Sequence, residues 1–365
     1  MMKVKEILSF LEEKFPLAYQ ESYDNAGLIT GDREADATGV LVCLDVSEAV
    51  LDEALALGAN VIVSHHPLIF HGIKKLNPHA YPDRLLMLAV RNNLNLYACH
   101  TNADNFKYGV NARLAEKLGL TNTYILNPLS GRLYKLVTFV PHQYAARVRQ
   151  AMFEAGAGHI GAYDHCSYNV EGYGTFRGSE AANPFVGEKG IDHTEPETRV
   201  EVIFPDYLQD KILHQMMKVH PYEEVAYDII PLANASPMAG AGLAGYLPEP
   251  VDTDTFLAEV KKALGVHSLR YSGTTKNNVH KIAVCGGSGS FLVPACVAAG
   301  ADAFVTADVK YHQFIEAADK LLLIDAGHYE TEAGAKEIFY ELLTKKFSNF
   351  AVHFSKRESN PVNYL

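Results

Sequence analysis

The chain has 365 residues, of which 48% are hydrophobic; this suggests roughly two or three domains with ample cores. Its formal net charge of -11 argues against a nucleic acid held through its phosphates, because such binding needs a basic face. No apolar run is long enough to span a membrane. The five cysteines include no CxxC pair, which favours buried thiols in a reducing cytoplasm over a disulfide framework or a thiolate zinc site.

The first third of the chain alternates strands and helices. It begins with an amphipathic helix at residues 1–15, which lacks the apolar core and the cleavage site of a signal peptide. Strands are then predicted at 39–46, 61–64 and 94–99, and helices at 47–59, 81–93 and 109–119. Strands that are apolar throughout and separated by helices indicate a sheet covered on both faces.

The last third repeats this pattern. Strands are predicted at 280–287, 302–307 and 320–327, and helices at 290–300, 311–319 and 331–347. Residues 58–67 resemble 300–309, and residues 93–104 resemble 319–330, in the same order. This weak internal repeat predicts two similar halves whose strand C-termini converge on one cleft, where open α/β sheets bind their ligands.

The middle of the chain has a different order, strand–helix–strand–strand–helix–strand, which is that of a ferredoxin-like domain. Glycines and prolines mark both of its ends. The predicted fold class is therefore α/β, with two similar α/β halves that form one discontinuous domain and an inserted ferredoxin-like (βαββαβ) domain. The halves cover residues 1–127 and 239–365, and the insert covers 128–238.

A polar and aromatic stretch precedes the last strand of the insert. It contains His220, Tyr222, Glu223 and Glu224. Two interpretations stay open, a contact for a small molecule or ion and a structural turn with an exposed acidic pair, and we favour the turn.

Possible metal ligands follow three of the predicted strands. They are His65, His66, Asp104, His328 and Glu332. His328 and Glu332 are four residues apart at a helix start and share one face, whereas the adjacent His65 and His66 point to opposite sides of an extended segment. Three imidazoles and two carboxylates suit Zn, Mn, Fe(II), Co or Ni better than Ca or Mg. They are too many for one tetrahedral zinc and suit two divalent ions per subunit with a bridging carboxylate.

Each of these motifs has a simpler explanation when it is taken alone. The histidine pair can be a hydrogen-bonded loop, Glu332 a favourable charge in a first helical turn, and Asp104 a helix cap. The prediction of a metal site depends on all three segments lying at the C-terminal ends of strands in a repeated α/β unit.

Further polar residues lie at neighbouring positions. His100, His312 and Lys310 are the candidate catalytic residues, with His312 a possible proton donor and Lys310 a possible partner for an anionic group. The candidates for substrate binding are Asn25, Lys74, Asp308 and Ser288. Ser288 belongs to the turn GGSGS, which either cradles a phosphate at a helix N-terminus or is plain turn geometry. No GxxxxGK[ST] loop occurs, so a Walker-type nucleotide hydrolase is not supported.

Five motifs carry a resemblance to a known family. They are DNAGL at 24–28, SHHPLIF at 64–70, HTNAD at 100–104, TADVKYH at 306–312 and GHYETE at 327–332. Over its whole length the chain resembles the dinuclear-metal-centre family named GTP cyclohydrolase I type 2 homologues, the Nif-three-like family. It differs at Tyr23, where Trp is common in the family, and at Ala307, where Gly is usual.

The resemblance implies that the five ligand candidates hold two divalent metals, with Zn, Mn, Fe or Co as the expected ions. It also implies a toroidal homohexamer, with sites that face an internal cavity, and a PII-like or CutA-like insert. The family name implies hydrolytic opening of the guanine ring of GTP, release of formate and formation of dihydroneopterin triphosphate.

The leading hypothesis is thus a cytoplasmic, oligomeric two-metal hydrolase of this type, acting on a small molecule such as GTP or another nucleotide. A metal-dependent phosphoesterase or amidohydrolase with the same site is one alternative. A metal-binding regulatory assembly without turnover is the other.

Overall fold

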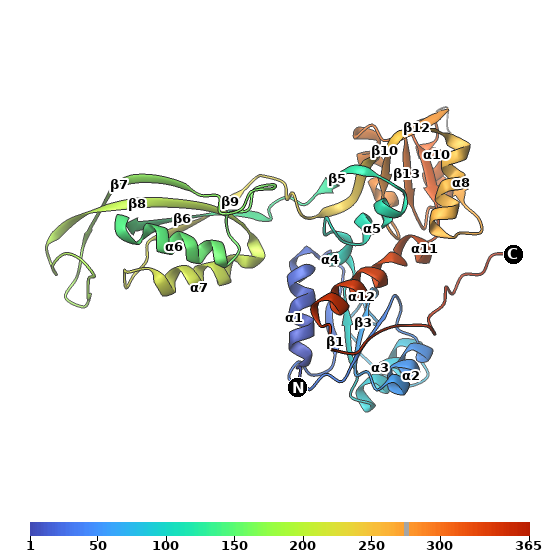
Figure 1. The fold of residues 1–365 in the computed structure, drawn as a ribbon, viewed down its shortest axis with the longest axis horizontal. Helices are drawn as coiled ribbons and strands as arrows, with labels where there is room; N and C mark the ends of the chain where they lie inside the picture. The colour runs from blue at the N-terminus through green and yellow to red at the C-terminus, as the bar shows by residue number, and fades with distance from the viewer. Residues whose placement is uncertain (274–276) are drawn as a thin grey trace. The chain divides into compact units, whose positions relative to one another are not determined.

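The computed structural model describes residues 1–273 and 277–365, and these fall into two compact units. The first unit combines Met1–Pro128 with Met238–Leu365, and the second is Leu129–Pro237 (Figure 1). The first unit therefore consists of two chain segments, joined through the second. No helix in the described part of the chain is long and apolar enough to cross a membrane.

One half of the first unit is built on a five-stranded sheet of order β1–β4–β3–β2–β15, and its strand β15 comes from the C-terminal end of the chain. These strands are β1 (Gly27–Thr30), β2 (Val40–Cys43), β3 (Val61–Ser64), β4 (Asn95–Ala98) and β15 (Val352–Phe354). Strands β15, β2, β3 and β4 run parallel, and β1 pairs antiparallel with β4. Their inner residues are fully buried, as expected of a sheet covered on both faces.

Helices cover both faces of this sheet. They are α1 (Val4–Lys14), α2 (Glu48–Leu57), α3 (Tyr81–Arg91) and α12 (Gly334–Lys346). Side chains alternate along β3, so Val61 and Val63 pack with α1 and α12 while Ile62 packs with α2 and α3. Helix α2 begins where the sequence predicts, because the Ser47 hydroxyl accepts a hydrogen bond from the Val50 N–H at 3.3 Å.

The other half is built on a six-stranded sheet of order β11–β14–β13–β12–β10–β5, and its strand β5 comes from the first chain segment. Its strands are β5 (Thr121–Pro128), β10 (Gly240–Asp252), β11 (Arg270–Tyr271), β12 (Asn278–Val284), β13 (Ala303–Thr306) and β14 (Leu322–Asp325). Helices α5 (Val110–Lys117) and α8 (Thr253–Leu264) form one apolar cluster with the strands of this sheet. Helices α9 (Val293–Ala298) and α10 (Tyr311–Ala317) form a second cluster with them.

The two sheets share one topology over four strands, since the order β1–β4–β3–β2 corresponds to β11–β14–β13–β12. In both, three strands are parallel and an edge strand pairs antiparallel with the third. The predicted fold class of two similar α/β halves is confirmed. Two short helices, α4 (Thr101–Asp104) and α11 (His328–Glu332), follow β4 and β14 at equivalent places.

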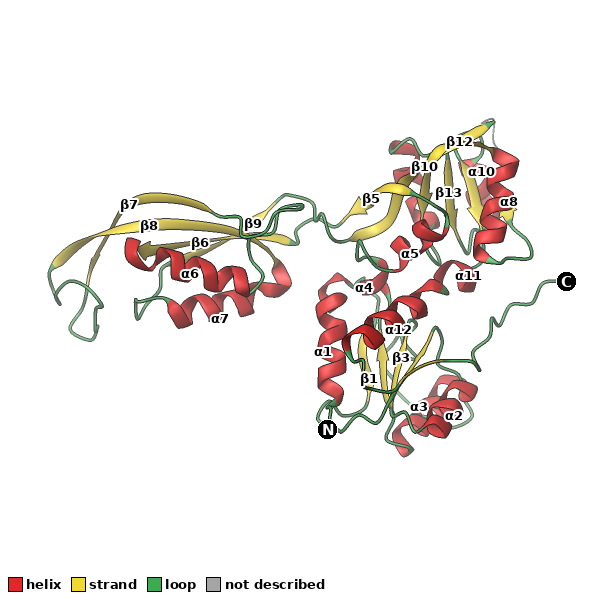
Figure 2. Ribbon diagram, viewed as in Figure 1, coloured by secondary structure: helices red, strands yellow, loops and turns green. Residues whose placement is uncertain are grey.

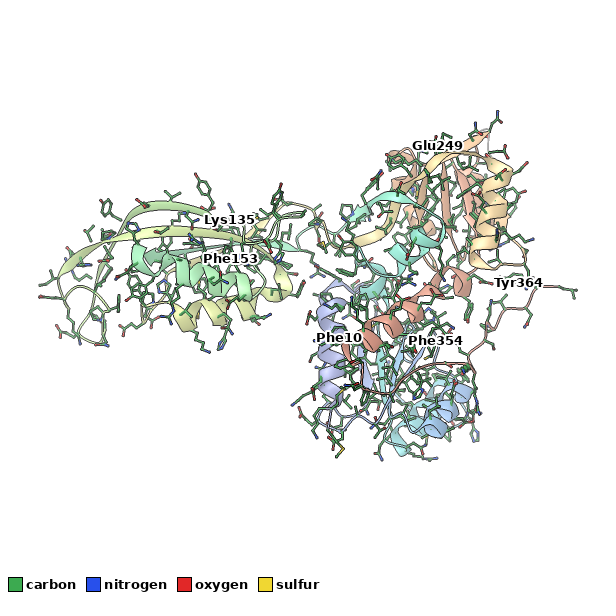
Figure 3. All side chains as sticks on the ribbon, in the orientation of Figure 1. Phe10, Lys135, Phe153, Glu249, Phe354 and Tyr364 are labelled. Carbon is green, nitrogen blue, oxygen red and sulfur yellow. The ribbon has the colours of Figure 1, made fainter. Side chains whose placement is uncertain are left out.

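The second unit has the predicted order β-α-β-β-α-β. Its elements are β6 (Leu133–Pro141), α6 (His142–Glu154), β7 (Tyr168–Arg177), β8 (Asp192–Pro205), α7 (Gln209–Val219) and β9 (Tyr227–Leu232). The strands form an antiparallel sheet of order β7–β8–β6–β9. Both helices pack on one face of it (Figure 2), and Phe153 of α6 belongs to the core between them (Figure 3). The predicted ferredoxin-like insert is confirmed.

Candidate metal centre

The five residues predicted as metal ligands come together at the carboxyl ends of parallel strands from both sheets. His65 and His66 directly follow β3, and Asp104 ends the short helix α4 after β4. His328 and Glu332 begin and end α11, directly after β14. Segments more than 200 residues apart in the chain thus meet at one point, which is where open α/β sheets place their ligands.

His65 is fully buried, and the backbone sets its orientation. Its Nδ1–H donates to the carbonyl oxygen of Cys99 at 2.8 Å, so its Nε2 carries a free lone pair. This Nε2 lies 3.6 Å from Asp104 Oδ1 and 3.8 Å from Glu332 Oε1. Burial lowers the pKa of His65 and keeps the ring neutral.

Two of these atoms lack the partners that buried polar atoms normally have. His65 Nε2 and Asp104 Oδ1 are both buried and accept no hydrogen bond from any described residue. A lone pair and a carboxylate oxygen cannot satisfy each other, because both are acceptors. A cation between them would satisfy both, so the residues present fit a metal ion.

His66 and His328 are each held from behind by a carboxylate. The Nδ1–H of His66 donates to Asp45 Oδ1 at 2.8 Å, and that of His328 donates to Asp308 Oδ2 at 2.7 Å. The Nε2 atoms of both rings lie 2.9 Å from Glu332 Oε2. Carboxylates behind metal-binding histidines commonly fix the ring orientation and raise its basicity.

The electrostatics of the cluster favour positive charge. Burial lowers the pKa of His66, but hydrogen bonds to Asp45 and Glu332 outweigh it and raise that pKa to about 10. His328 is likewise opposed by burial, yet Glu332 and Asp308 raise its pKa to about 9. The carboxylates that draw protons onto these rings would also attract a metal cation.

The two buried carboxylates differ in their surroundings. Burial, reinforced by the charge of Glu332, raises the pKa of Asp104 well above its usual range. Burial also disfavours the charge on Glu332, but hydrogen bonds from His328 and His66 hold its pKa well below the usual range. A cation would relieve the repulsion between the two carboxylates and allow both to ionise.

Three sets of side chains among the described residues can hold a metal ion, since the ligand atoms within each set lie within 4.8 Å of one another. One set is His65, Asp104 and Glu332, and a second is His66, His328 and Glu332. Glu332 belongs to both. The third set adds His100 to the histidine pair.

His100 is oriented by Asp24. The Nδ1–H of His100 donates to Asp24 Oδ1 at 2.7 Å, and the backbone N–H and hydroxyl of Thr101 donate to the other oxygen. Burial opposes the charge on Asp24, but these donors lower its pKa to about 2. The neighbouring Asn25, predicted to bind substrate, instead donates from its side chain to the Ile69 carbonyl at 2.7 Å and ties two loops together.

A cavity of about 490 Å³ lies beside the cluster. The exposed edges of Tyr23, Phe70, Tyr81 and Phe291 surround it, and Ser288 also lines it. No lysine or arginine occurs among the described residues of this lining. Lys74, Lys310 and His312 are exposed and lie outside it, and Asp308 reaches the cluster through its hydrogen bond to His328.

The turn GGSGS packs against the cluster. Its backbone N–H groups at Gly286, Gly287 and Gly289 donate to the side chains of Asn111, Thr331 and Thr306 at 2.8–3.0 Å. A Cβ at Gly287, where φ is +58°, would collide with the Glu332 carboxylate. Close approach to Glu332 therefore accounts for the glycine at position 287, and plain turn geometry is the better of the two interpretations of GGSGS.

Sequence reasoning missed two residues of the site, Asp45 and Asp24. Asp45 stands just after β2, so the rule that singled out the residues after β3 and β4 could have found it. Asp24 lies inside the motif DNAGL, but nothing in the sequence shows that it contacts His100, which follows 76 residues later.

The fold and the cluster together define a class: an α/β protein with two repeated halves and a buried histidine–carboxylate centre between their strand ends that can hold a metal ion.

Comparison with known proteins identifies the family. Residues 2–361 match the model of the family Duf34/NIF3 (NGG1p interacting factor 3), and the chain belongs to that family. It is 38% identical over 364 residues to a Halalkalibacterium halodurans protein named GTP cyclohydrolase 1 type 2 homolog, covering 98% of both chains. A Bacillus subtilis protein of the same name is 36% identical, with 99% of this chain and 98% of the relative covered.

A solved structure agrees with this assignment. The crystal structure of a Bacillus cereus protein related to NIF3 is 38% identical and superposes with a TM-score of 0.87, covering 100% of this chain and 99% of that one. The resemblance drawn from the five sequence motifs is thereby confirmed.

Proposed function

We propose that this chain binds two divalent metal ions at the cluster and uses them to hydrolyse a small-molecule substrate, with the guanine ring of GTP as the first candidate. One observation carries the proposal. The two oxygens of Glu332 face different histidines: Oε1 faces His65 at 3.8 Å, and Oε2 faces His66 and His328 at 2.9 Å.

This arrangement divides the ligands into two groups. His65 and Asp104 would hold one ion, His66 and His328 would hold the other, and Glu332 would bridge them. The adjacent histidines then serve different ions, as the opposite directions of neighbouring side chains suggest. Zn, Mn, Fe(II) and Co all suit such a set of nitrogen and oxygen ligands. When bound, two such ions polarise a substrate carbonyl or ring and lower the pKa of water.

His100 is the residue best placed to move a proton. Its Nδ1–H is committed to Asp24, so the neutral ring has an unprotonated Nε2. His100 also lines the cavity, where a substrate would lie. A histidine oriented by a buried carboxylate is the usual arrangement of a general base.

The cavity supports a substrate with a flat ring. Four aromatic side chains surround it, and relatives that share more than a third of the sequence are named GTP cyclohydrolase 1 type 2 homolog. The described lining has no lysine or arginine, so the phosphates of GTP would find neither of these side chains there. We therefore expect guanosine and GTP to be processed with KM values within about tenfold of each other.

The test is a turnover assay with GTP on protein that has been reconstituted separately with Zn, Mn, Fe(II) and Co. Formate, pterin fluorescence, free phosphate and the amount of bound metal are all followed. The Glu332→Gln variant removes the proposed bridge, and we expect it to lose at least one metal per chain and about 100-fold or more of the activity. Glu330→Gln is the matched control, because Glu330 lies two residues away and binds Asn360 instead.

The outcomes separate the parts of the proposal. Formate and pterin from the wild type, lost in Glu332→Gln and kept in Glu330→Gln, would support both reaction and site. Phosphate without formate would replace the cyclohydrolase reaction with phosphoester hydrolysis at the same site. Two bound metals without any product would favour a regulatory role. Binding of fewer than two metals by the wild type would refute the dinuclear centre.

A further inference from the structure

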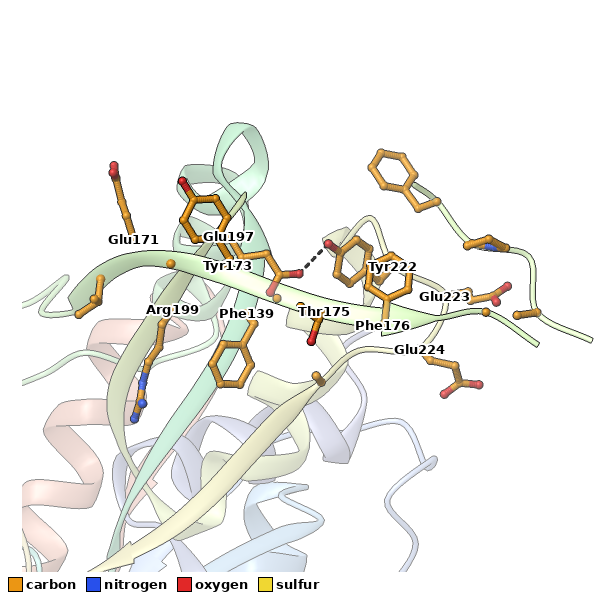
Figure 4. A pocket seen from close by; sticks show the side chains of 18 residues that line it. Phe139, Glu171, Tyr173, Thr175, Phe176, Glu197, Arg199, Tyr222, Glu223 and Glu224 are labelled. Atoms are coloured by element: carbon orange, nitrogen blue, oxygen red, sulfur yellow. Dashed lines mark hydrogen bonds between the residues drawn. The ribbon is translucent and has the colours of Figure 1, made fainter. Parts of the chain in front are cut away.

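The second unit contains a cavity of about 590 Å³ that is separate from the metal centre and is formed by the second unit alone (Figure 4). Glu197 and Arg199 of β8 contribute to it, and they alternate with Val200 and Val202, which pack with α6 and α7. Side chains alternate across a strand, so the cavity lies on the face of the sheet that these helices do not cover. Its size is within the range of small-molecule pockets, about 300–1,000 Å³.

Glu197 is the chemical centre of this cavity. Its side chain is almost completely enclosed, with the residue only 7% exposed. One carboxylate oxygen accepts a hydrogen bond from the Tyr222 hydroxyl at 2.7 Å, drawn as a dashed line in Figure 4. The other oxygen lies over Gly174, where any Cβ would collide with it. The strand thus has a glycine at the point where this carboxylate needs room.

The carboxylate has no cationic partner among the described residues. Arg199, two residues along the strand, pairs instead with Glu201 at 2.9 Å. The cavity is also lined by Glu171, Glu223 and Glu224, so carboxylates outnumber its one arginine. A buried carboxylate without a countercharge is costly, and a ligand cation would remove that cost.

The remaining walls are aromatic. They come from Phe139, Phe176, Phe185 and Tyr222. The rings of Phe176 and Phe185 lie 6.2 and 6.3 Å from that of Tyr222. The loop that carries Phe185 is held in place by Glu223, which accepts from the Asn183 N–H at 2.7 Å. Aromatic faces around a carboxylate attract organic ammonium ions through cation–π contacts and a charge pair.

An inorganic cation fits less well. The sets of side chains that could hold a metal ion, among the residues described, all belong to the first unit. Aromatic carbon, which dominates these walls, is not a metal ligand.

The stretch from His220 to Glu224 supplies more than a turn, because Tyr222 donates to the Glu197 carboxylate and Glu223 holds the loop that carries Phe185.

We propose that this cavity binds a small organic ammonium ion, a primary or methylated amine on an apolar body, with its nitrogen at the Glu197 carboxylate. The proposal is independent of the reaction at the metal centre.

The test is isothermal titration calorimetry of the full-length protein with three probes of the same shape: phenethylammonium, 2-phenylethanol and phenylacetate. We expect phenethylammonium to bind at least about tenfold more tightly than the neutral alcohol, and phenylacetate to show no binding. Equal binding of the ammonium and the alcohol, or no binding of the ammonium, would overturn the proposal.

Three variants locate the binding. Glu197→Gln should weaken phenethylammonium binding at least about tenfold, because it removes the charge and keeps the shape. Glu195→Gln makes the same change two residues away, where the side chain binds His193 outside the lining, and should leave binding unchanged. Gly172→Val should abolish binding without harming the fold, because a Cβ at Gly172 meets open space within the cavity lining.

Wild-type affinity in Glu197→Gln would contradict the proposal. So would a change of oligomeric state in Gly172→Val with ammonium binding intact, which would make this face a contact between copies of the chain.

Discussion

His65 shows how a single backbone contact prepares a side chain for metal binding. Because a carbonyl oxygen can only accept, the bond to Cys99 fixes the proton on Nδ1 and directs the lone pair of Nε2 toward Asp104 and Glu332. No neighbouring side chain is needed to choose the tautomer. His66 and His328 depend on carboxylates for the same purpose.

This difference leads to a prediction for Asp45. Asp45→Asn should lower the affinity of the proposed centre for one of its two metals by about 10- to 100-fold, because an amide holds the His66 ring less firmly and makes it less basic. The measurement is a competition titration with a chromophoric chelator, which resolves two metals of different affinity. Asp52→Asn, an exposed change on α2, is the control. Two unchanged affinities in Asp45→Asn would show that this carboxylate does not support the metal.

At the scale of elements, two short helices and a glycine turn bring the ligands together. Helix α11 is only five residues long, and its first and last residues, His328 and Glu332, meet across one turn at 2.9 Å. The GGSGS turn after β12 lies so close to Glu332 that a Cβ at position 287 would collide with its carboxylate. Backbone geometry in this turn therefore limits where the proposed bridging carboxylate can lie.

Gly287→Ala tests that limit. Gly287 and Gly300 both have positive φ, +58° and +70°, so alanine at either position should cost about 1–2 kcal/mol of backbone strain. Only the Cβ at 287 collides with Glu332, whereas the Cβ at 300 meets open space. Both variants should therefore lose similar thermal stability, but only Gly287→Ala should lose metal, as measured by elemental analysis of the purified protein. Equal metal content in the two variants would mean that the turn does not position Glu332.

At the scale of the whole molecule, the insert lies in the chain between β5 and β10, two strands that pair with each other. Pro128 at the end of β5 lies opposite Gly240 at the start of β10 in an antiparallel pair. The second unit has its own core, built from α6, α7 and the sheet beneath them. Neither the candidate ligands nor their supporting carboxylates come from the insert.

We therefore predict that the insert can be removed. A chain in which Leu129–Pro237 is replaced by a short Asn-Gly turn should fold and bind the same number of metals as the full protein, because that turn closes an antiparallel pair. It should no longer bind phenethylammonium. Elemental analysis and calorimetry of the shortened protein give both answers. Loss of metal in a folded, shortened chain would show that the centre depends on the insert.

The hexamer implied by the family resemblance is also a property of this scale. It stays a prediction, and native mass spectrometry would test it against six times the chain mass of 40.1 kDa.

The sequence by itself determined the fold class and the family. The apolar strands and the alternating helices can be predicted locally, because burial on both faces of a sheet requires continuous apolar runs, and the repeat is visible as two similar segments. It also singled out the five candidate ligands, since each follows a predicted strand and such ends meet at one edge. That these five bind metal stays a prediction.

Only the tertiary structure decided which polar residues join the cluster. Asp45 and Asp24 join it, while Lys74, Lys310 and His312 lie on the surface outside the cavity. The tertiary structure alone also singled out Glu197, which in the sequence is one acidic residue among several on a strand. Its enclosure depends on Tyr222 and Gly174, which reach it from a loop and another strand. Periodicity along a strand reports which face a side chain takes, but its partners come from distant segments that only the folded chain brings close.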